Sequence, residues 1–275
     1  MKIESPKRRK ISVALATYNE EENLGHCLDA VQSFADEIVI VDGSSEDKTV
    51  EVAKKYKALV IVTDNPPIFH INKQKAIDAC SGEWILQLDA DEVIPSELAG
   101  EIVDIARKGS RFAGFWIKRK NYFLGRFLKR GGQYPDPVIR FFKKDHGFLL
   151  CQSVHEQIKI KGEVGWLENP MLHFSTPAFS RYLTNSNRYT SLTAEELSKK
   201  DTPFNFKNHL NYFLFLPAST FFKIYFRHKG FVDGFPGFVF ALFSGLHHPI
   251  SYIKLIFQQN IKRILPAKYQ TLGKK

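Results

Sequence analysis

Three carboxylates stand close together directly after an apolar run of the chain. Residues 84–88 are apolar except for one glutamine, and Asp89, Ala90, Asp91 and Glu92 follow them. Carboxylates at the carboxyl end of a strand suit a hard divalent cation, because Mg²⁺ and Mn²⁺ are held by one or two of them plus substrate phosphates. A solvated acidic turn would carry the same residues. The pattern therefore indicates a metal or phosphate site only if other polar groups converge on it.

Short apolar runs alternate with helix-like segments in the same part of the chain. Residues 10–16, 37–41, 59–62 and 84–88 predict buried strands, and residues 20–34, 49–56 and 72–80 predict helices. Strands that alternate with helices predict right-handed crossovers and a mostly parallel sheet. Ligands of such sheets gather at the carboxyl ends of the strands. Because Thr17, Asp42 and Asp89 each follow a predicted strand, we expect them to line one cleft.

Three motifs, taken together and in order, resemble the signature series of the family 2 inverting glycosyltransferases. They are ATYNE at 16–20, VDGSSEDKT at 41–49 and LDADE at 88–92, within roughly the first 95 residues. The resemblance implies the GT-A fold, an α/β, Rossmann-like arrangement in which helices flank a mixed sheet. It also implies transfer of a sugar from a nucleotide-diphosphate donor.

The first two motifs imply a pocket for the nucleotide. By resemblance, Thr17, Tyr18 and Glu20 line the base and ribose, and Asp42, with Ser44 beside it, accepts a hydrogen bond from the base ring. An ionised carboxylate is only an acceptor and the uracil N3–H is a donor, so this pairing is chemically sensible. The same Asp-Gly-Ser segment also fits a turn with a helix N-cap.

The third motif and a preceding helix imply the diphosphate site. By resemblance, Asp89 contacts the ribose or the metal, Ala90 lies beside it, and Asp91 coordinates the Mg²⁺ or Mn²⁺ that bridges the two phosphates. Lys73 stands where family members often carry Arg or Lys, and a lysine there acts as a point charge on phosphate. Lys75 is the weaker candidate for the same role.

Residues 96–199 form the expected acceptor half and contain the candidate base. An inverting transfer needs a group that takes the proton of the acceptor hydroxyl as its oxygen attacks the anomeric carbon. Glu156 is favoured, since Val-His-Glu resembles a segment near the donor sugar in one subgroup, and Asp136 is the alternative. His155 is a candidate metal or phosphate ligand, although a histidine in a strand is commonly structural. Arg140 resembles the family's Arg-x-Phe step and is expected to touch a phosphate.

Two features of the family pattern are missing from this sequence. No Glu-Asp pair follows the acidic motif cleanly, which leaves the base to be chosen between Glu156 and Asp136. No Gln-x-x-Arg-Trp occurs in the C-terminal half. That motif marks processive polymer synthases, so we expect this chain to add one sugar and stop.

Residues 200–275 differ from the rest of the chain in composition. They contain 11 Lys and Arg against two acidic residues, which is +9 of the total formal charge of +10, and 13 of the 24 Phe. Basic and aromatic residues interleaved at helical spacing predict helices in a membrane interface, attracted by anionic lipid. A spanning helix needs about 20 apolar residues, and polar residues and prolines interrupt both candidate segments. Packed core is the alternative; nucleic-acid binding lacks an accompanying motif.

Looser motifs extend the resemblance over most of the chain. Residues 187–190, 194–196, 230–238 and 251–255 resemble the C-terminal part of the bacterial lipopolysaccharide inner-core glucosyltransferases of family 2. This resemblance implies a UDP-hexose donor and a lipid-linked or lipopolysaccharide-core acceptor.

The composition of the chain and the uneven distribution of its charge predict two regions and a cellular location. Residues 1–199 are expected to form the catalytic domain, with a nucleotide-sugar half at about 10–95, and residues 200–275 a membrane-associating helical region. Three unclustered cysteines indicate neither a disulfide framework nor a zinc site. Residues 1–10 are basic but are followed by a strand-like run, unlike a signal peptide. We therefore expect a cytoplasmic enzyme, peripheral on the inner face of the cytoplasmic membrane.

Two other functions compete with the transferase interpretation. A sugar nucleotidyltransferase uses a related sheet and acidic metal ligands, but it carries a Gly-rich loop after the first strand, and residues 17–21 contain no glycine. A catalytically silent membrane adaptor on an old enzyme fold is the second alternative. The intact acidic motif argues against it, and a turnover measurement would decide.

Overall fold

The computed structural model describes residues 10–152, 156–176 and 178–264. The chain divides into two compact units. The first comprises Met1–Asn121 and Pro135–Ser175, and the second comprises Tyr122–Tyr134 and Thr176–Lys275.

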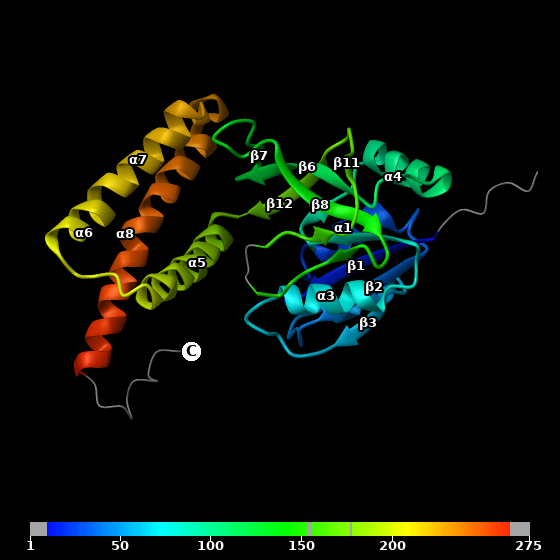
Figure 1. The fold of residues 1–275 in the computed structure, drawn as a ribbon, viewed down its shortest axis with the longest axis horizontal. Helices are drawn as coiled ribbons and strands as arrows, with labels where there is room; N and C mark the ends of the chain where they lie inside the picture. The colour runs from blue at the N-terminus through cyan, green and yellow to red at the C-terminus, as the bar shows by residue number, and fades with distance from the viewer. Residues whose placement is uncertain (1–9, 153–155, 177, 265–275) are drawn as a thin grey trace, which may run out of the picture. The chain divides into compact units, whose positions relative to one another are not determined.

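Alternating strands and helices build the N-terminal part of the first unit (Figure 1). The strands are β1 (Ile11–Thr17), β2 (Glu37–Asp42), β3 (Leu59–Val62) and β4 (Trp84–Leu88), and the helices are α1 (Leu24–Val31), α2 (Thr49–Lys55), α3 (His70–Ala79) and α4 (Ser96–Lys108). These strands run parallel in the order β3-β2-β1-β4. The predicted elements and their parallel arrangement are confirmed, with small differences at the helix ends.

Later strands extend the sheet and make it mixed. They are β5 (Glu92–Val93), β6 (Gly114–Phe123), β8 (Asp136–Lys143) and β12 (Met171–Thr176), in the spatial order β4-β8-β6-β12-β5. Two short strands, β7 (Arg126–Phe127) and β11 (Val164–Trp166), pair with β6, while β9 (Gly147–Phe148) and β10 (Lys159–Ile160) form a separate two-stranded sheet. Because β8 runs antiparallel to β4, the predicted mixed sheet flanked by helices is confirmed.

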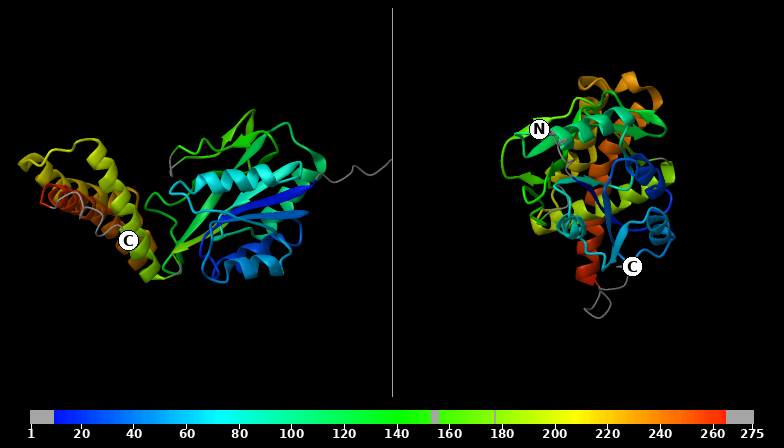
Figure 2. Two further views of the ribbon diagram at one scale, coloured as in Figure 1. Left: turned by 90° about the horizontal axis from the view of Figure 1, so that it is seen from below. Right: turned by 90° about the vertical axis from the view of Figure 1, so that its right-hand side faces the viewer.

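Helices cover both faces of the parallel strands, which explains why those strands read as continuous apolar runs. Leu28 of α1 and Leu98 of α4 pack with Val13 of β1 in one buried cluster. Ala76 of α3 packs with Ala14 of the same strand in a second cluster. Figure 2 shows α3 on the face of the sheet opposite α1. Alternate side chains of β1 therefore pack into two hydrophobic clusters, one on each face of the sheet.

One carboxylate ties the start of β2 to two neighbouring segments. Glu37 accepts hydrogen bonds from Ser12 Oγ at 2.5 Å, from the Ser81 backbone N–H at 2.8 Å and from Ser81 Oγ at 3.0 Å. The backbone must come close here, because a Cβ at Gly82 would lie 2.5 Å from Ser12 Oγ. Burial opposes ionisation of Glu37, but the hydrogen bonds outweigh it and lower the pKa of Glu37.

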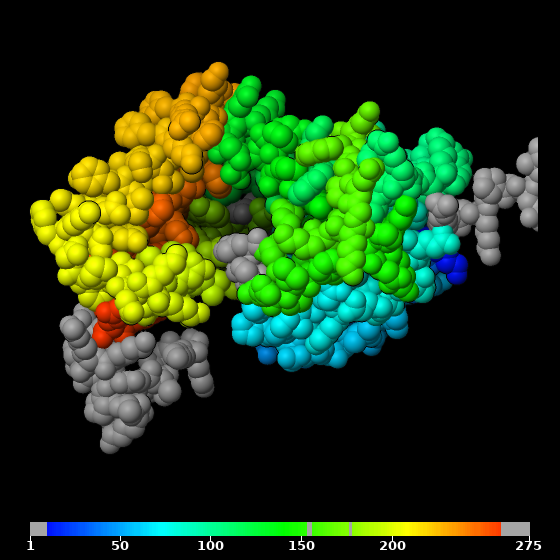
Figure 3. All heavy atoms as spheres, viewed as in Figure 1, coloured from blue at the N-terminus to red at the C-terminus, as the bar shows by residue number. Residues whose placement is uncertain are grey.

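The second unit is built from helices. They are α5 (Phe179–Lys199), α6 (Phe206–Leu210), α7 (Leu216–Phe222) and α8 (Gly234–Ile264), with π-helical turns η1 (Asn211–Phe215) and η2 (Lys223–Arg227) and a 3-10 turn η3 (Gly230–Asp233). The run from α6 to η2 is nearly continuous, and α8 returns alongside it. In the space-filling view, side chains of α6 and α7 lie next to those of α8 (Figure 3). The predicted basic, Phe-rich C-terminal helices are thus present.

Helix α5 belongs to this second unit because polar contacts join it to α8. Lys254 Nζ donates to Asn187 Oδ1 at 2.6 Å and to Thr190 Oγ1 at 2.8 Å, and Thr193 Oγ1 lies 3.0 Å from His247 Nε2. The division expected at residue 199 therefore falls between two helices of one compact unit. Of the helices within the described ranges, none has the length and apolarity needed to cross a bilayer.

Glu37→Gln is expected to lower the free energy of unfolding at neutral pH by about 1 kcal/mol, because the charged acceptor of several hydrogen bonds is lost. The pKa of Glu37 is lower in the folded chain than in the unfolded chain. The stabilisation by the Glu37 charge is therefore fully present above the unfolded pKa and is lost as the pH falls through the folded pKa. Urea unfolding of the wild-type chain and the variant, at neutral and at acidic pH, measures the difference in the free energy of unfolding at each pH. Glu51→Gln of α2 is the control. A difference that persists unchanged in acid would contradict this account.

Candidate active site

Asp42 lies buried at the carboxyl end of β2 and organises the turn that follows. Thr17 Oγ1, from the end of β1, donates to Asp42 Oδ2 at 2.9 Å, while the Ser45 N–H and Ser45 Oγ donate to the carboxylate at 2.8 and 2.7 Å. The predicted turn is therefore present, but the helix that follows begins only at Thr49. A carboxylate has about four acceptor positions, so three of these donors leave capacity for one more.

The remaining nucleotide candidates lie in the loops around this turn. Tyr18 exposes 43% of its surface. The Glu20 carboxylate accepts from Asn23 Nδ2 at 2.7 Å. Ser44 adopts a left-handed backbone, with φ of 63°, and donates its Oγ to the Thr63 carbonyl after β3 at 2.7 Å. Hydrogen bonds therefore join the ends of β1 and β2 and the loops that follow β2 and β3 at one edge of the sheet.

Asp89 lies at the carboxyl end of β4 between two cationic side chains. Lys73 of α3 forms an ion pair with Oδ1, and Arg140 of β8 lies 2.6 Å from Oδ2. Burial opposes ionisation, but the charges of Arg140 and Lys73 outweigh it and hold the pKa of Asp89 well below its ordinary value. Both oxygens of Asp89 are thus already engaged by protein cations. Lys75 lies apart from this pair, on the exposed side of α3, where it contacts Thr63 and Asp64.

Glu92 is a fully buried carboxylate to which the sequence motifs assigned no role. Its Oε1 lies 2.8 Å from Arg140 Nη2 and 3.4 Å from Arg119 Nη1, and its Oε2 accepts the Asp89 backbone N–H at 2.9 Å. Arg140 also donates to Gln87 at 2.5 Å. Glu92 therefore holds two arginines and fixes the backbone of the acidic motif. A glutamine inside an otherwise apolar strand was the available sequence signal for this buried polar cluster.

Asp91 faces a histidine that the sequence reasoning missed. His173 Nε2 lies 3.5 Å from Asp91 Oδ2, and His173 Nδ1 lies 2.6 Å from Asn121 Oδ1. Pairing of β12 with β5 sets His173 opposite Glu92. Burial disfavours charge on both groups, but their mutual hydrogen bond outweighs it, so the pKa of Asp91 is lowered and that of His173 is raised. The position of His173 between the apolar residues Leu172 and Phe174 was the available sequence signal for this pair.

The two candidate bases lie in different surroundings. Asp136, at the start of β8, is held through Oδ2 by Arg119 Nη2 at 2.5 Å and by Asn121 Nδ2 at 3.0 Å. It thereby joins the same ionic network as Glu92. Glu156 lies in the loop between β9 and β10, where its Oε1 accepts the Cys151 N–H at 2.6 Å. His155, predicted as a metal ligand, lies outside the described residues.

The residues present fit a divalent cation only in part. Across the described ranges, no group of three or more His, Cys, Asp or Glu side chains is arranged to hold a metal ion. Asp89 is occupied by cations, whereas Asp91 is an ionised carboxylate whose side chain is 22% exposed. Magnesium is commonly held by one or two carboxylates plus substrate phosphates. Asp91 therefore fits as the protein's oxygen ligand to a cation that a diphosphate would complete.

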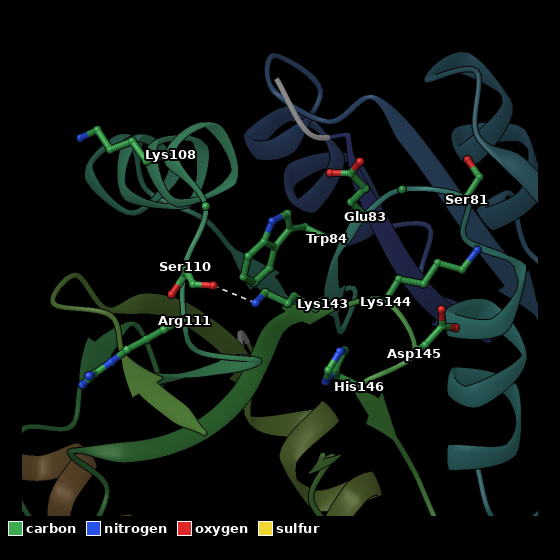
Figure 4. A pocket seen from close by; sticks show the side chains of 12 residues that line it. Ser81, Glu83, Trp84, Lys108, Ser110, Arg111, Lys143, Lys144, Asp145 and His146 are labelled. Carbon is green, nitrogen blue, oxygen red and sulfur yellow. Dashed lines mark hydrogen bonds between the residues drawn. The ribbon is translucent and has the colours of Figure 1, made fainter. Parts of the chain in front are cut away.

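A separate hollow lies at the other end of β4 (Figure 4). It has a volume of about 730 Å³ and is lined by Glu83 and Trp84 at the start of β4 and by Lys143 at the end of β8. Lys143 Nζ donates to the Ser110 carbonyl at 2.7 Å. Asp89 follows the opposite end of the same strand, so none of the predicted site residues lines this hollow.

Comparison with known proteins places this geometry in a family. Residues 12–159 match the family model described as glycosyl transferase family 2. The lipopolysaccharide core biosynthesis glycosyltransferase LpsC of Rhizobium meliloti (strain 1021) is 26% identical over 272 residues, which is 93% of this chain and 95% of LpsC. A glycosyltransferase of Rickettsia typhi is 28% identical over 244 residues, 84% of this chain and 81% of its own.

Solved structures show weaker similarity. S. aureus TarS in complex with UDP has a TM-score of 0.46 and 16% identity, covering 92% of this chain and 91% of that one. Glucosyl-3-phosphoglycerate synthase from Mycobacterium tuberculosis, in complex with Mn²⁺, UDP and glucosyl-3-phosphoglycerate, has a TM-score of 0.44 and 16% identity, covering 71% and 81%.

Glu92→Ala is expected to lower the free energy of unfolding by about 3 kcal/mol, because it removes the partner that Arg140 and Arg119 share and leaves the buried charge of Arg140 less compensated. Thermal unfolding followed by circular dichroism measures the loss. The matched control is Glu97→Ala on the exposed side of α4. Equal melting temperatures for the two variants would show that Glu92 does not stabilise the network.

Proposed function

The chain belongs to glycosyl transferase family 2, and on this premise we propose that it moves one sugar from a nucleotide-diphosphate sugar to a lipid-linked or lipopolysaccharide-core acceptor. The observation that carries the proposal is the gathering of Asp42, Asp89 and Asp91 at the carboxyl ends of β2 and β4, with Lys73 and Arg140 beside them. Family membership supplies the reaction class, and the site supplies roles for the side chains.

The proposed donor is a UDP-hexose. Asp42 is buried, is held in place by Thr17 and Ser45, and keeps an acceptor position that suits the uracil N3–H. The exposed ring of Tyr18 is available to contact the base, and Glu20 lies in the same loop near the expected ribose. Rejection of donors with other bases would follow, because a base that presents an acceptor there leaves the Asp42 carboxylate unpaired.

Charge balance supports a need for a divalent cation. The ionic network contains three basic side chains and four carboxylates, and His173, whose pKa is raised, adds a fourth positive charge when protonated. The cations are Lys73, Arg119 and Arg140, and the carboxylates are Asp89, Asp91, Glu92 and Asp136. The network therefore offers no net positive charge to a diphosphate. Bound Mg²⁺ or Mn²⁺ would neutralise the charge that develops on the leaving group.

Asp91 is the proposed protein ligand of that cation, with His173 fixing the orientation of its carboxylate. Lys73 and Arg140 hold Asp89 and are close enough to the acidic motif to approach a phosphate when Asp89 turns to the ribose. Glu92 keeps the backbone of Asp89 in place. Each of these side chains thus binds or positions a group, and none needs to change covalently.

The proposed base is Glu156, which takes the proton of the acceptor hydroxyl while that oxygen attacks opposite the leaving diphosphate and inverts the anomeric centre. The backbone N–H groups of Cys151 and Gln152 orient its carboxylate. Asp136 is less suited, because Arg119 and Asn121 already bind its Oδ2. Its role in this proposal is to hold Arg119 against the network.

A lipid-linked acceptor requires the enzyme to work at a membrane, and we place it on the inner face of the cytoplasmic membrane. Residues 200–275 carry nearly all of the net positive charge, which supports attraction to anionic lipid. In this proposal the first unit performs the transfer and the helices of the second unit bring the chain to its acceptor.

Asp91→Asn is expected to leave the fold intact and to abolish transfer. With UDP-glucose and Mn²⁺ together, the wild-type chain should melt at a higher temperature than with either alone, since ligands that bind only the native state stabilise it. The variant should lose this joint effect, and UDP release with lipopolysaccharide core as acceptor should fall more than about tenfold. Asp104→Asn on α4 is the control. Retention of wild-type turnover by Asp91→Asn would remove Asp91 from the site.

Glu156→Gln is expected to lower kcat by about 10²- to 10⁴-fold while the affinity for the donor stays near normal, because the amide keeps the shape but cannot take a proton. Asp136→Asn should do less to turnover. Steady-state transfer and donor-binding measurements on both variants separate the two roles. If Asp136→Asn is inactive and Glu156→Gln is active, the assignment of the base is reversed.

A further inference from the structure

We propose that the second unit docks on an anionic lipid bilayer through one continuous apolar face, made by the outer stripe of α8 and the aromatic turn that precedes it. The membrane setting rests on the proposed function, but the docking face is argued from the helical unit alone. The occupant is the bilayer surface itself, with acyl chains against the stripe and anionic headgroups against the turn.

The outer face of α8 is apolar along its described length. Its exposed large side chains follow one another at spacings of three or four residues: Phe235, Phe238, Leu242, Leu246, Ile250, Ile253 and Phe257. This spacing places them on one side of the helix, over about 33 Å at 1.5 Å per residue. The opposite side also packs apolar residues, since Ala241, Tyr252 and Leu255 are buried. A helix at the surface of a soluble domain normally turns polar residues outward, and α8 does not.

The aromatic turn comprises residues 222–231, at the end of α7 and in η2 and η3, and its rings continue this face beyond the start of α8. Phe222 stacks on Phe226 with centroids 5.4 Å apart, and Phe231 lies 6.2 Å from Tyr225. Tyr225 in turn lies 5.8 Å from Phe238 of the stripe. Phe222, Phe226 and Phe231 are each about half exposed. Contiguous apolar surface of this kind marks an interaction site rather than ordinary solvent-facing surface.

Cationic side chains surround the aromatic end, and exposed acids are lacking there. Lys223, Arg227 and Lys229 are exposed beside the rings. Asp233 is the only acidic residue between 202 and 264. It is buried, and its carboxylate accepts the backbone N–H groups of the segment 129–130 at 3.0 and 2.8 Å. The exposed field at this end is therefore positive.

An apolar stripe next to exposed basic side chains favours a bilayer over a second copy of the chain as the partner of this face. A second copy seated on the same face would bring like charges together, which costs free energy, whereas anionic headgroups would neutralise them. The turn would therefore bind headgroups while the stripe enters the boundary between headgroups and acyl chains. Helix α8 then lies in the plane of the surface.

Vesicle sedimentation with two matched pairs of variants tests the proposal on the full chain. Leu242→Ser with Leu246→Ser alters the stripe, and its control is Leu59→Ser with Val62→Ser on the exposed edge of β3. The vesicles contain phosphatidylcholine alone or phosphatidylcholine with phosphatidylglycerol. The wild-type chain should bind the anionic vesicles and be only partly released by high salt. The stripe variant should lose the salt-resistant fraction, and its control should not.

The second pair tests the charges of the turn. Lys223→Gln, Arg227→Gln and Lys229→Gln together should weaken binding about a hundredfold. Their control, Lys54→Gln, Lys55→Gln and Lys57→Gln, removes three exposed lysines from the first unit, and Lys57 shares the left-handed backbone of Lys229. Circular dichroism verifies that every variant is folded.

Equal vesicle binding by the stripe variant and the wild-type chain would overturn the proposal. So would a dimer in light scattering that the stripe variant abolishes while vesicles bind neither form, because the face would then belong to a second copy. Stabilisation by UDP-glucose with Mn²⁺ is measured on the same variants and should be unchanged. Loss of vesicle binding is thereby separated from failure of the proposed transferase function.

Discussion

The buried ion cluster around Arg140 is the interaction on which the first unit depends. Arg140 comes from an antiparallel strand, yet its partners Asp89 and Glu92 stand at the end of a parallel strand and just beyond it. A buried charge costs several kcal/mol unless it is paired, so the two halves of the sheet must be in register before these charges are compensated. The site is therefore complete only when the antiparallel strand β8 is paired with the parallel strand β4.

Much of the N-terminal part of the first unit could be predicted, because its information is local. Four apolar runs gave the parallel strands, and polar residues directly after them, such as Asp42 and Asp89, had to reach one edge of the sheet. The partners of these residues could not be predicted in the same way. Arg119 and His173 reach the acidic motif through β6 and β12, whose positions depend on strand pairings between distant segments.

The helical unit shows a different limit of prediction. Its charge and phenylalanine content are plain in the sequence, but α8 is apolar on both its buried and its exposed sides, so periodicity alone does not reveal which side faces outward. Packing against α5 and α7 decides this. The same packing explains why α5 joins this unit, since Lys254 finds its acceptors there, and composition carries no sign of that contact.

The near neutrality of the ionic network governs how its proposed ligands would assemble. A nucleotide diphosphate alone would add uncompensated negative charge to the site, and a divalent cation alone would add uncompensated positive charge. Together they nearly cancel, so each would raise the affinity for the other by the same factor. Such a site favours entry of the pair as a complex. After transfer, the nucleotide would remain until its cation can leave with it, which makes product release a natural slow step of the cycle.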